Sequence, residues 1–288
     1  MRPLRTRLLE ARKRSETPWE VLERDYLLSW LLAGIAEKPA LRDNLVFKGG
    51  TALRKCYFGE YRFSEDLDFS GHEGAPVGDE VEHWVEEACA TAVELLDEYA
   101  PVEITCERYR ERQPHPGGQE AFTIRARLPW HSRLQTRVMI EVTVDERILW
   151  PPEKRLLIHN YGEPLRAALQ VYPLEEIVAE KLRALLQQAD LLEKRGWSRS
   201  RARDYYDLWR VLSTYGDRMD WADFNPRLRE KCALRGVAFS GTKDFFNEHI
   251  LAYVEETWEQ SLGVLVPGLP SFDTVAGELR PRIAAVLS

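Results

Sequence analysis

Two aspartates separated by one residue, Asp66 and Asp68, have the type and spacing that suit chemistry. They alternate with Leu67 and Phe69, and this alternation predicts a β-strand. Because successive side chains of a strand point to opposite faces, the two carboxylates would share one face while the apolar pair enters a core. Two carboxylates this close repel each other unless a cation lies between them, and oxygen ligands of this kind suit Mg²⁺.

A pair of glycines precedes the aspartates and suits a phosphate. Residues 46–47 are typical of the end of a buried strand, and residues 51–57 of a short helix that begins at Gly49-Gly50 and ends at Gly59. The first N–H groups of a helix carry a positive dipole end, which favours an anion. A lone Gly-Gly or Asp-x-Asp usually marks a turn or a solvated strand edge. The order strand, glycine pair, helix and strand instead indicates nucleotide chemistry.

This arrangement resembles motif I of the nucleotidyltransferase superfamily. In detail, residues 47–53 (FKGGTAL) and 62–69 (RFSEDLDF) are similar to the pattern of the AbiEii/AbiGii toxin family, which includes the MenT toxins. A second match follows in the same order, with Glu180-Lys181-Leu182-x-Ala184 and then Arg203-Asp204-x-x-Asp207-Leu208. The resemblance covers about residues 45–212.

The resemblance implies a fold and a set of roles. The fold is α/β (α+β), a polymerase-beta-like nucleotidyltransferase sheet of mixed strands with flanking helices and a helical C-terminal region. Asp66 and Asp68 would hold Mg²⁺ (or Mn²⁺), with an NTP as substrate. Lys181 would neutralise the triphosphate. Asp204 matches a later essential aspartate of the family and would position the acceptor or act as a base, with Asp207 as the fallback.

Further residues of the matching segments are expected at the nucleotide. The glycine pair would bring N–H groups to the β- and γ-phosphates, with the hydroxyls of Thr51 and Ser64 within reach. Arg62 and Arg203 are expected either to contact phosphate or tRNA or to pair with the nearby aspartates. The expected nucleotide-binding set is Lys48, Gly49, Gly50, Thr51, Arg62, Ser64 and Lys181.

A third carboxylate is expected from a later strand. Residues 137–146 (RVMIEVTVDE) alternate, with valines and an isoleucine on one face. Glu141 falls mid-strand on the other face, where a carboxylate is costly to bury unless it is paired or bound to metal. It is the candidate third metal ligand, and Asp145 is the runner-up. A salt-bridged glutamate on a half-exposed strand is the alternative.

Other elements follow from periodicity and from glycine and proline breaks. A turn that includes His115 is expected at residues 111–119. The expected domains are a nucleotidyltransferase core at 1–165 and a helical domain at 166–288 that contributes Lys181 and Asp204. Expected helices span residues 18–37, 79–99, 173–189, 199–215, 221–235, 241–262 and 271–287, with strands at 102–108 and 121–128 and a polar loop at 193–198.

Composition narrows the class of protein. The chain has 288 residues, of which 44% are hydrophobic, enough for a substantial core. A net charge of −7 argues against a protein that coats nucleic acid without specificity. The four cysteines are scattered without a metal-binding spacing, and no apolar run reaches membrane-spanning length. A cytoplasmic protein without a membrane partner is expected.

The function implied by the resemblance is that of a toxin. It would transfer NMP from an NTP to RNA, at the 3′ end of tRNA, and so block translation, and a cognate antitoxin would be its protein partner. Two alternatives stay open: a nucleotidyltransferase or kinase-like modifier of a protein or small molecule, such as the antitoxin, and a non-catalytic nucleotide-binding regulator. The metal-type carboxylates and the Lys181 and Asp204 matches argue against the regulator.

Overall fold

The computed structural model describes residues 1–72, 74–109, 118–196 and 198–288. The turn expected around His115 lies outside the described residues, apart from its last two positions. The chain forms two compact units. Unit 1 comprises Met1–Glu146 and Pro152–Tyr172, and unit 2 comprises Arg147–Pro151 and Pro173–Ser288.

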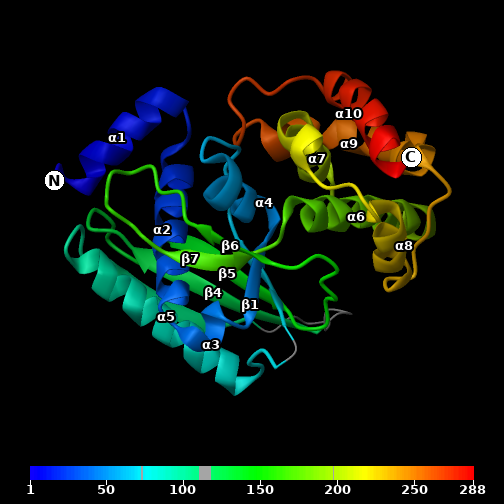
Figure 1. Cartoon of the computed structure of the whole chain (residues 1–288). Coiled ribbons are helices and arrows are strands. Elements are labelled where there is room, and N and C mark those ends of the chain that lie inside the picture. The colour runs from blue at the N-terminus through cyan, green and yellow to red at the C-terminus, as the bar shows by residue number, and fades with distance from the viewer. Residues whose placement is uncertain (73, 110–117, 197) are drawn as a thin grey trace. The chain divides into compact units, whose positions relative to one another are not determined.

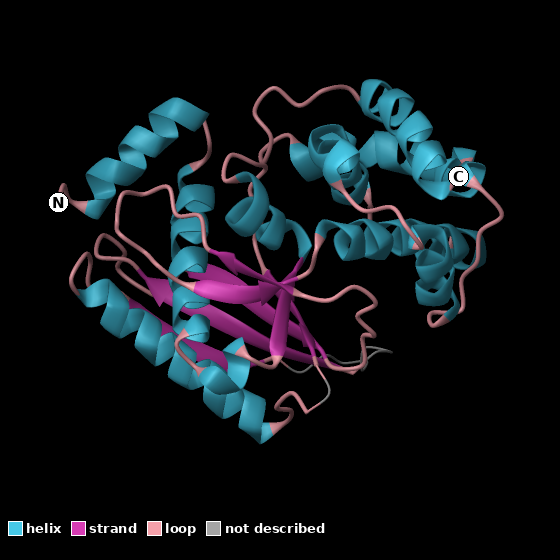
Figure 2. Cartoon of the chain, viewed as in Figure 1, coloured by secondary structure: helices cyan, strands magenta, loops and turns pink. Residues whose placement is uncertain are grey.

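Unit 1 is built on a mixed sheet (Figures 1 and 2). In the described residues it has seven strands in the order β3-β4-β5-β2-β1-β7-β6. The central strand β2 runs antiparallel to β1 and parallel to β5. The mixed sheet confirms the predicted fold class. The strands are β1 (Leu45–Lys48), β2 (Leu67–Gly71), β3 (Glu103–Arg108), β4 (Gln119–Arg127), β5 (Thr136–Thr143), β6 (Glu153–Leu156) and β7 (Ala168–Val171).

Helices α2 (Trp19–Ala36) and α5 (Asp79–Asp97) pack on each other and against the sheet. The alternating side chains of β5 confirm the expected core face, because Val138, Ile140 and Val142 are all buried. Two smaller helices complete this part of unit 1, α1 (Leu4–Ser15) and α3 (Pro39–Arg42).

Unit 2 is helical in its described residues. Helix α6 continues through Arg195 and ends at Gly196, so the loop expected from residue 193 starts later than predicted. Short 3₁₀ segments, η2 (Gly216–Arg218) and η3 (Thr242–Phe246), separate longer helices. The helices are α6 (Leu174–Arg195), α7 (Ala202–Tyr215), α8 (Phe224–Ala233), α9 (Glu248–Leu262) and α10 (Phe272–Leu287).

A buried ion pair attaches the short segment 147–151 to unit 2. Glu176 and Lys231 are both fully buried and lie 2.5 Å apart. Glu176 also accepts the backbone N–H groups of Leu149 and Trp150, and Lys231 donates to the carbonyl of Arg147. Burying two charges is tolerated only with such full hydrogen bonding, so this segment is fixed to α6 and α8.

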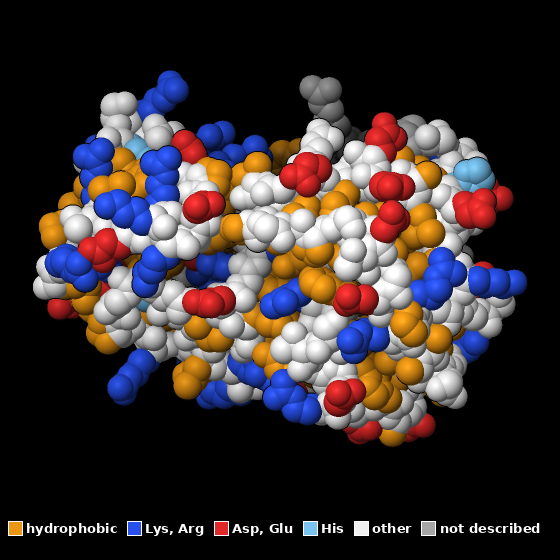
Figure 3. Space-filling view, turned by 90° about the horizontal axis from the view of Figure 1, so that it is seen from above, with side chains coloured by type: hydrophobic (Ala, Val, Ile, Leu, Met, Phe, Trp, Pro, Cys, Tyr) orange, Lys and Arg blue, Asp and Glu red, His pale blue; other side chains and the backbone are white. Residues whose placement is uncertain are grey.

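The surface carries charges of both signs, interspersed on the face shown in Figure 3. Across the described residues, every helix is either too short or too polar to cross a membrane.

The segment between β1 and β2 forms a continuous helical turn with two geometries. Helix α4 (Gly49–Ala52) starts at the glycine pair, as predicted, and continues as a π-helical segment, η1 (Leu53–Phe58). Gly59 ends it with φ 69°. The alternation predicted that Asp66 lies within strand β2. The strand begins only at Leu67, so Asp66 lies one residue before it.

A buried network of charges fixes η1 to α2. The Asp25 carboxylate accepts hydrogen bonds from Arg54 (2.7 Å) and from the hydroxyl of Tyr161 (2.7 Å), and Lys55 lies 2.9 Å away. Burial opposes the charge of Asp25, but Lys55 and Arg54 overcome this and hold its pKa well below the ordinary value.

A second network lies around Glu163. Its carboxylate accepts from Tyr26 (2.7 Å) and contacts His159 (3.0 Å) and Arg7 (2.5 Å). Burial opposes the charge, yet the hydrogen bonds from these partners lower the pKa of Glu163 to about 2. Burial lowers the pKa of His159, whose Nδ1 is buried with no hydrogen-bond partner among the described residues. His159 is therefore held neutral, with Nε2 donating to Glu163.

Acidification is expected to destabilise unit 1. The pKa values of His159 and Glu163 are both lowered by folding, so the unfolded chain binds more protons. The contribution of His159 is complete above about pH 6.5 and is lost below it, and that of Glu163 is lost between about pH 4.5 and about pH 2. Between about pH 7 and about pH 5.5 the free energy of unfolding should fall by at most about 1.4 kcal/mol per pH unit for one proton, and the urea midpoint should fall with it.

The control variant is His159→Gln, which keeps an N–H donor for Glu163 without a titrating ring. It should flatten the decline between about pH 7 and about pH 5.5. An equally steep decline in wild type and variant would show that His159 does not carry this pH dependence.

Candidate functional site

Three predicted site residues form one row across the sheet of unit 1. Asp68 on β2 is the register partner of Lys48 on β1 and of Glu141 on β5. Directly opposed residues of neighbouring strands share a face, so one cation and two carboxylates lie side by side. Asp68 and Glu141 are half-buried, while Lys48 is buried with its ammonium 5.6 Å from the ring centroid of Tyr172. The row thus reaches solvent through its carboxylates.

The side chains that pack against Gly49 and Gly50 leave no room for a Cβ at either position. Gly49 has φ 78°, and a Cβ built on it would lie 2.5 Å from Oδ2 of Asp68. A Cβ on Gly50 would overlap the guanidinium of Arg62. The sequence assigned these glycines to phosphate binding. In the structure they also leave space for a carboxylate and a cation that pack against the start of α4.

The segment that carries Asp66 is held by backbone and side-chain contacts. The hydroxyl of Thr51 donates to the carbonyl of Asp66 at 2.6 Å. Glu65 pairs with Arg24 of α2 at 2.7 Å, and Ser64 is buried. In this structure the Thr51 hydroxyl therefore positions the Asp66 backbone.

Arg54 is a residue that the sequence patterns did not single out. Its guanidinium bonds Asp25, donates to the carbonyl of Tyr61 and lies 3.8 Å from the ring centroid of Phe63. It thus holds both neighbours of Arg62, whose own Nη1 donates to the Phe63 carbonyl at 3.1 Å. The signal in the sequence is weak, because Asp25 follows two other charged residues and Arg54 precedes a lysine, so neither charge stands out in its helical segment.

Unit 2 brings together three other predicted residues. The ammonium of Lys181 on α6 lies 2.7 Å from a carboxylate oxygen of Asp204 and 2.7 Å from one of Asp207, both on α7. Asp207 is fully buried. Burial opposes the charge of Asp204, but Lys181 and Arg201 hold its pKa below the ordinary value. Arg201, 3.3 Å from Asp204, was not predicted.

Two other predicted site residues, Asp145 and Arg203, lie outside the row and the Lys181 ion pairs. Asp145 lies beyond the end of β5 at Thr143, so the alternation that qualified it does not extend to it. The Nε of Arg203 donates to the carbonyl of Ser261 at 3.4 Å.

The two carboxylates of the row, together with Asp66 directly before β2, have donor chemistry that fits a hard divalent cation. Asp66, Asp68 and Glu141 offer only oxygen ligands, and all three are half-buried. Among the described residues no group of three His, Cys, Asp or Glu side chains could hold a metal ion. Mg²⁺ commonly takes one or two carboxylates and completes its shell with waters and substrate phosphates, which this row permits.

Replacing Gly49 with alanine is expected to destabilise unit 1 by more than backbone strain alone. The positive φ would cost about 1–3 kcal/mol, and the contact with Asp68 would add a similar overpacking cost. The difference in urea midpoint between wild type and variant measures the sum.

The matched control is Gly162→Ala, since Gly162 has φ 97° and a Cβ placed on it would have nothing within 4 Å. This variant should lose only the strain. Equal losses of stability in the two variants would mean that the Asp68 side chain moves aside for the methyl group at no cost in free energy.

Lys181→Met is expected to destabilise unit 2 by about 3–5 kcal/mol at neutral pH, because two carboxylates would remain without their shared cation. Loss of the ammonium raises the pKa of the aspartate pair, so the folded variant takes up protons more readily than the unfolded chain. Its deficit relative to wild type should therefore shrink as the pH falls to about 5.

The double variant Lys181→Met/Asp207→Asn removes one of the two opposing charges and should be less destabilised at neutral pH. Urea titrations at two pH values compare the three proteins. A deficit of the single variant that is independent of pH would contradict the carboxylate repulsion.

Comparison with known proteins agrees with the motifs. The chain matches the family model described as nucleotidyl transferase AbiEii toxin, type IV toxin–antitoxin system, over residues 30–278. The match includes both the row in unit 1 and the Lys181 cluster in unit 2. A search of curated proteins found no match. Because the family model spans most of the chain, the protein belongs to the AbiEii family of nucleotidyltransferase toxins.

Proposed function

We propose that this nucleotidyltransferase toxin transfers NMP from an NTP to RNA, at the 3′ end of tRNA, in a reaction dependent on Mg²⁺ or Mn²⁺. The observation that carries the proposal is the row of Lys48, Asp68 and Glu141, with the Asp68 carboxylate packed against Gly49. It sets oxygen ligands for a cation directly beside helix N–H groups suited to phosphates.

Asp66 and Asp68 would hold the metal ion, with Glu141 as the neighbouring third carboxylate. A bound cation would neutralise charge that develops on the phosphate oxygens and on the leaving pyrophosphate. Waters and the phosphates of the NTP would complete its ligands.

Lys48 of the row, the glycine pair and Arg62 would bind the triphosphate. The N–H groups of Gly49 and Gly50 suit its β- and γ-phosphates, and Lys48 and Arg62 supply positive charge beside them. Ser64 is the remaining hydroxyl near this segment, because the Thr51 hydroxyl already bonds the Asp66 backbone. In the reaction the acceptor oxygen forms a bond to the α-phosphorus while the bond to the pyrophosphate oxygen breaks.

Lys181 and Asp204 would act as a linked pair. Lys181 suits the triphosphate as a compact positive charge, and Asp204 and Asp207 hold it in place. A general base works best with a pKa near the working pH, whereas the pKa of Asp204 is lowered. We therefore assign Asp204 to orienting the acceptor hydroxyl rather than to accepting its proton.

Addition of a nucleotide to the tRNA 3′ end would prevent charging with an amino acid and so block translation. A cognate antitoxin is implied by the type IV toxin–antitoxin family. The alternative acceptors are a protein, such as the antitoxin, and a small molecule.

The test incubates the protein with each labelled NTP in turn, a divalent cation and total tRNA. Label is expected in tRNA for the wild type and is expected to fall by at least about 100-fold in Asp68→Asn, which removes one metal-type carboxylate charge. The matched control is Asp43→Asn, since Asp43 is an exposed aspartate of unit 1 paired with Arg42, and it should keep full activity.

The distribution of label decides between acceptors. Label on protein and not on tRNA would overturn the RNA acceptor and leave nucleotidyl transfer in place. Full activity of Asp68→Asn would overturn the assignment of the row as the catalytic site.

A further inference from the structure

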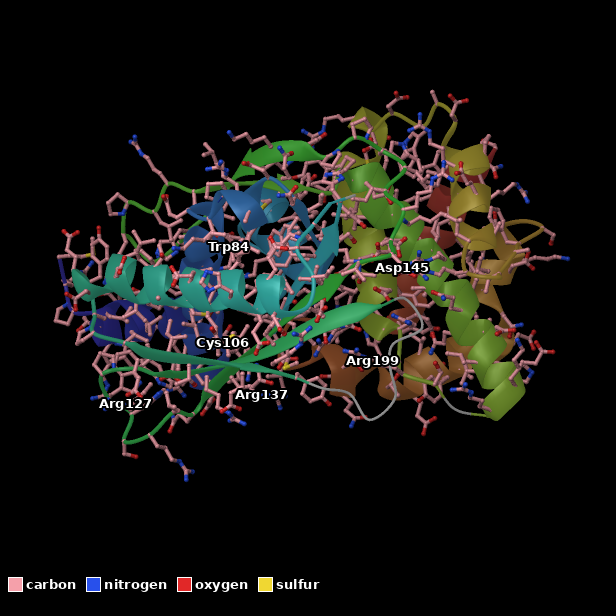
Figure 4. The ribbon with its side chains drawn as sticks, turned by 90° about the horizontal axis from the view of Figure 1, so that it is seen from below. Trp84, Cys106, Arg127, Arg137, Asp145 and Arg199 are labelled. Carbon is pink, nitrogen blue, oxygen red and sulfur yellow. The ribbon has the colours of Figure 1, made fainter. Side chains whose placement is uncertain are left out.

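The sheet face that carries Asp68 and Glu141 also carries exposed arginines, and two of them, Arg125 and Arg137, lie directly opposite each other. Arg137 lies four residues before Glu141 on β5, so both side chains point to the same face, about 13 Å apart along the strand at ~3.3 Å per residue. Arg125 on β4 is the register partner of Arg137 and is also exposed. Figure 4 shows Arg137 beyond the strands, on the side away from α5. We call Arg125 and Arg137 the arginine pair.

No ion pair with a described residue balances the charge of the arginine pair. Among the described residues neither guanidinium has a carboxylate partner, whereas the nearby Arg127 pairs with Glu103 at 2.6 Å. Thr105, which faces Arg125 from β3, is neutral. Like charges directly opposite each other on neighbouring strands are destabilising, so the arrangement has a cost that folding does not offset.

The side chain of Arg24 contacts both the strand of the arginine pair and the segment that carries Asp66. β2 pairs with β5 only from Ile140 onward, and Arg24 instead bonds the carbonyl of Arg137 at 3.1 Å. The same guanidinium pairs with Glu65, which directly precedes Asp66. The arginine pair is thus held at a fixed place relative to the row. Between them on β5 and β4 lie the uncharged Met139 and Thr123, and the exposed Glu107 of β3 is the register partner of Thr123.

This geometry fits the sugar-phosphate backbone of a nucleic acid. Guanidinium groups bind phosphate through two parallel hydrogen bonds, and fixed ones select both position and direction. An overall charge of −7 repels RNA, so productive binding requires a local positive track. We propose that Arg125 and Arg137 hold phosphates of the acceptor RNA upstream of its reacting 3′ end. The inference rests on the proposed transfer to RNA and identifies the surface that binds the acceptor.

The test is the double variant Arg125→Ala/Arg137→Ala in the full chain, with total tRNA as acceptor. Loss of two phosphate contacts should raise KM for tRNA on the order of tenfold, with kcat and KM for NTP unchanged. The slope of log KM against log salt concentration should fall by about 1.4–1.8. With a dinucleotide acceptor, which has only one internucleotide phosphate, wild type and variant should react alike.

The matched control is Arg12→Ala/Arg14→Ala, which removes two exposed arginines of α1 and the same net charge. It should leave the tRNA parameters unchanged. Equal effects of the two double variants would mean that net charge alone sets RNA affinity and would overturn the arginine pair as a track.

Failure of the inference can be distinguished from failure of the proposed function. Wild-type transfer to tRNA with an unchanged KM in the arginine-pair variant overturns the inference alone. Absence of wild-type transfer to any RNA overturns both. Unchanged tRNA kinetics with weakened binding of the antitoxin protein would assign the pair to an acidic protein segment and also overturn the inference.

Discussion

The close approach of the Asp68 carboxylate to Gly49 is the constraint on which the candidate site depends. It requires a residue without a side chain at the end of β1, and it requires a positive φ there. The same turn brings the N–H groups of α4 next to the carboxylate row. The positive end of the helix dipole at the start of a helix stabilises a negative charge, so the Asp68 carboxylate is stabilised at this place before any ligand binds. In the proposed function, substrate phosphates would share that end with Asp68, and a cation between the two would offset their repulsion.

Positive charges are arranged differently in the two units. In unit 1, Lys48 lies in the row and Arg62 packs on Gly50. In unit 2, Lys181 is shared by two aspartates and is available to an anion only in competition with them. Two carboxylates hold the Lys181 ammonium in one position, and they offset its positive charge. The arrangement therefore fixes the place of the ammonium but adds little to the affinity for an anion.

Much of the local geometry of the candidate site could be predicted from the sequence because it is encoded in short spacings. The glycine pair, the alternation around Asp68 and the face of β5 follow from backbone periodicity, and the family resemblance was confirmed over most of the chain. Asp66 was placed within the strand because alternation does not reveal where pairing with β5 begins.

Long-range polar networks could not be predicted in this way. Asp25 and Arg54 are 29 positions apart, and Glu176 and Lys231 are 55 apart, so no local pattern links their members. The strands β6 and β7 are four residues each, too short for their alternation to be recognised.

The route of the chain between the two units has a consequence for synthesis on the ribosome. Residues 147–151 belong to unit 2, although the chain returns to unit 1 for β6 and β7 before α6 begins. The partners of this segment, Glu176 and Lys231, leave the ribosome later, the second of them more than 80 residues after Arg147. Unit 1 can therefore complete its sheet while five of the residues between its strands still lack their partners. A stop codon placed after Tyr172 would yield a sheet that carries an unanchored loop, so neither unit can be separated from the other by a single cut.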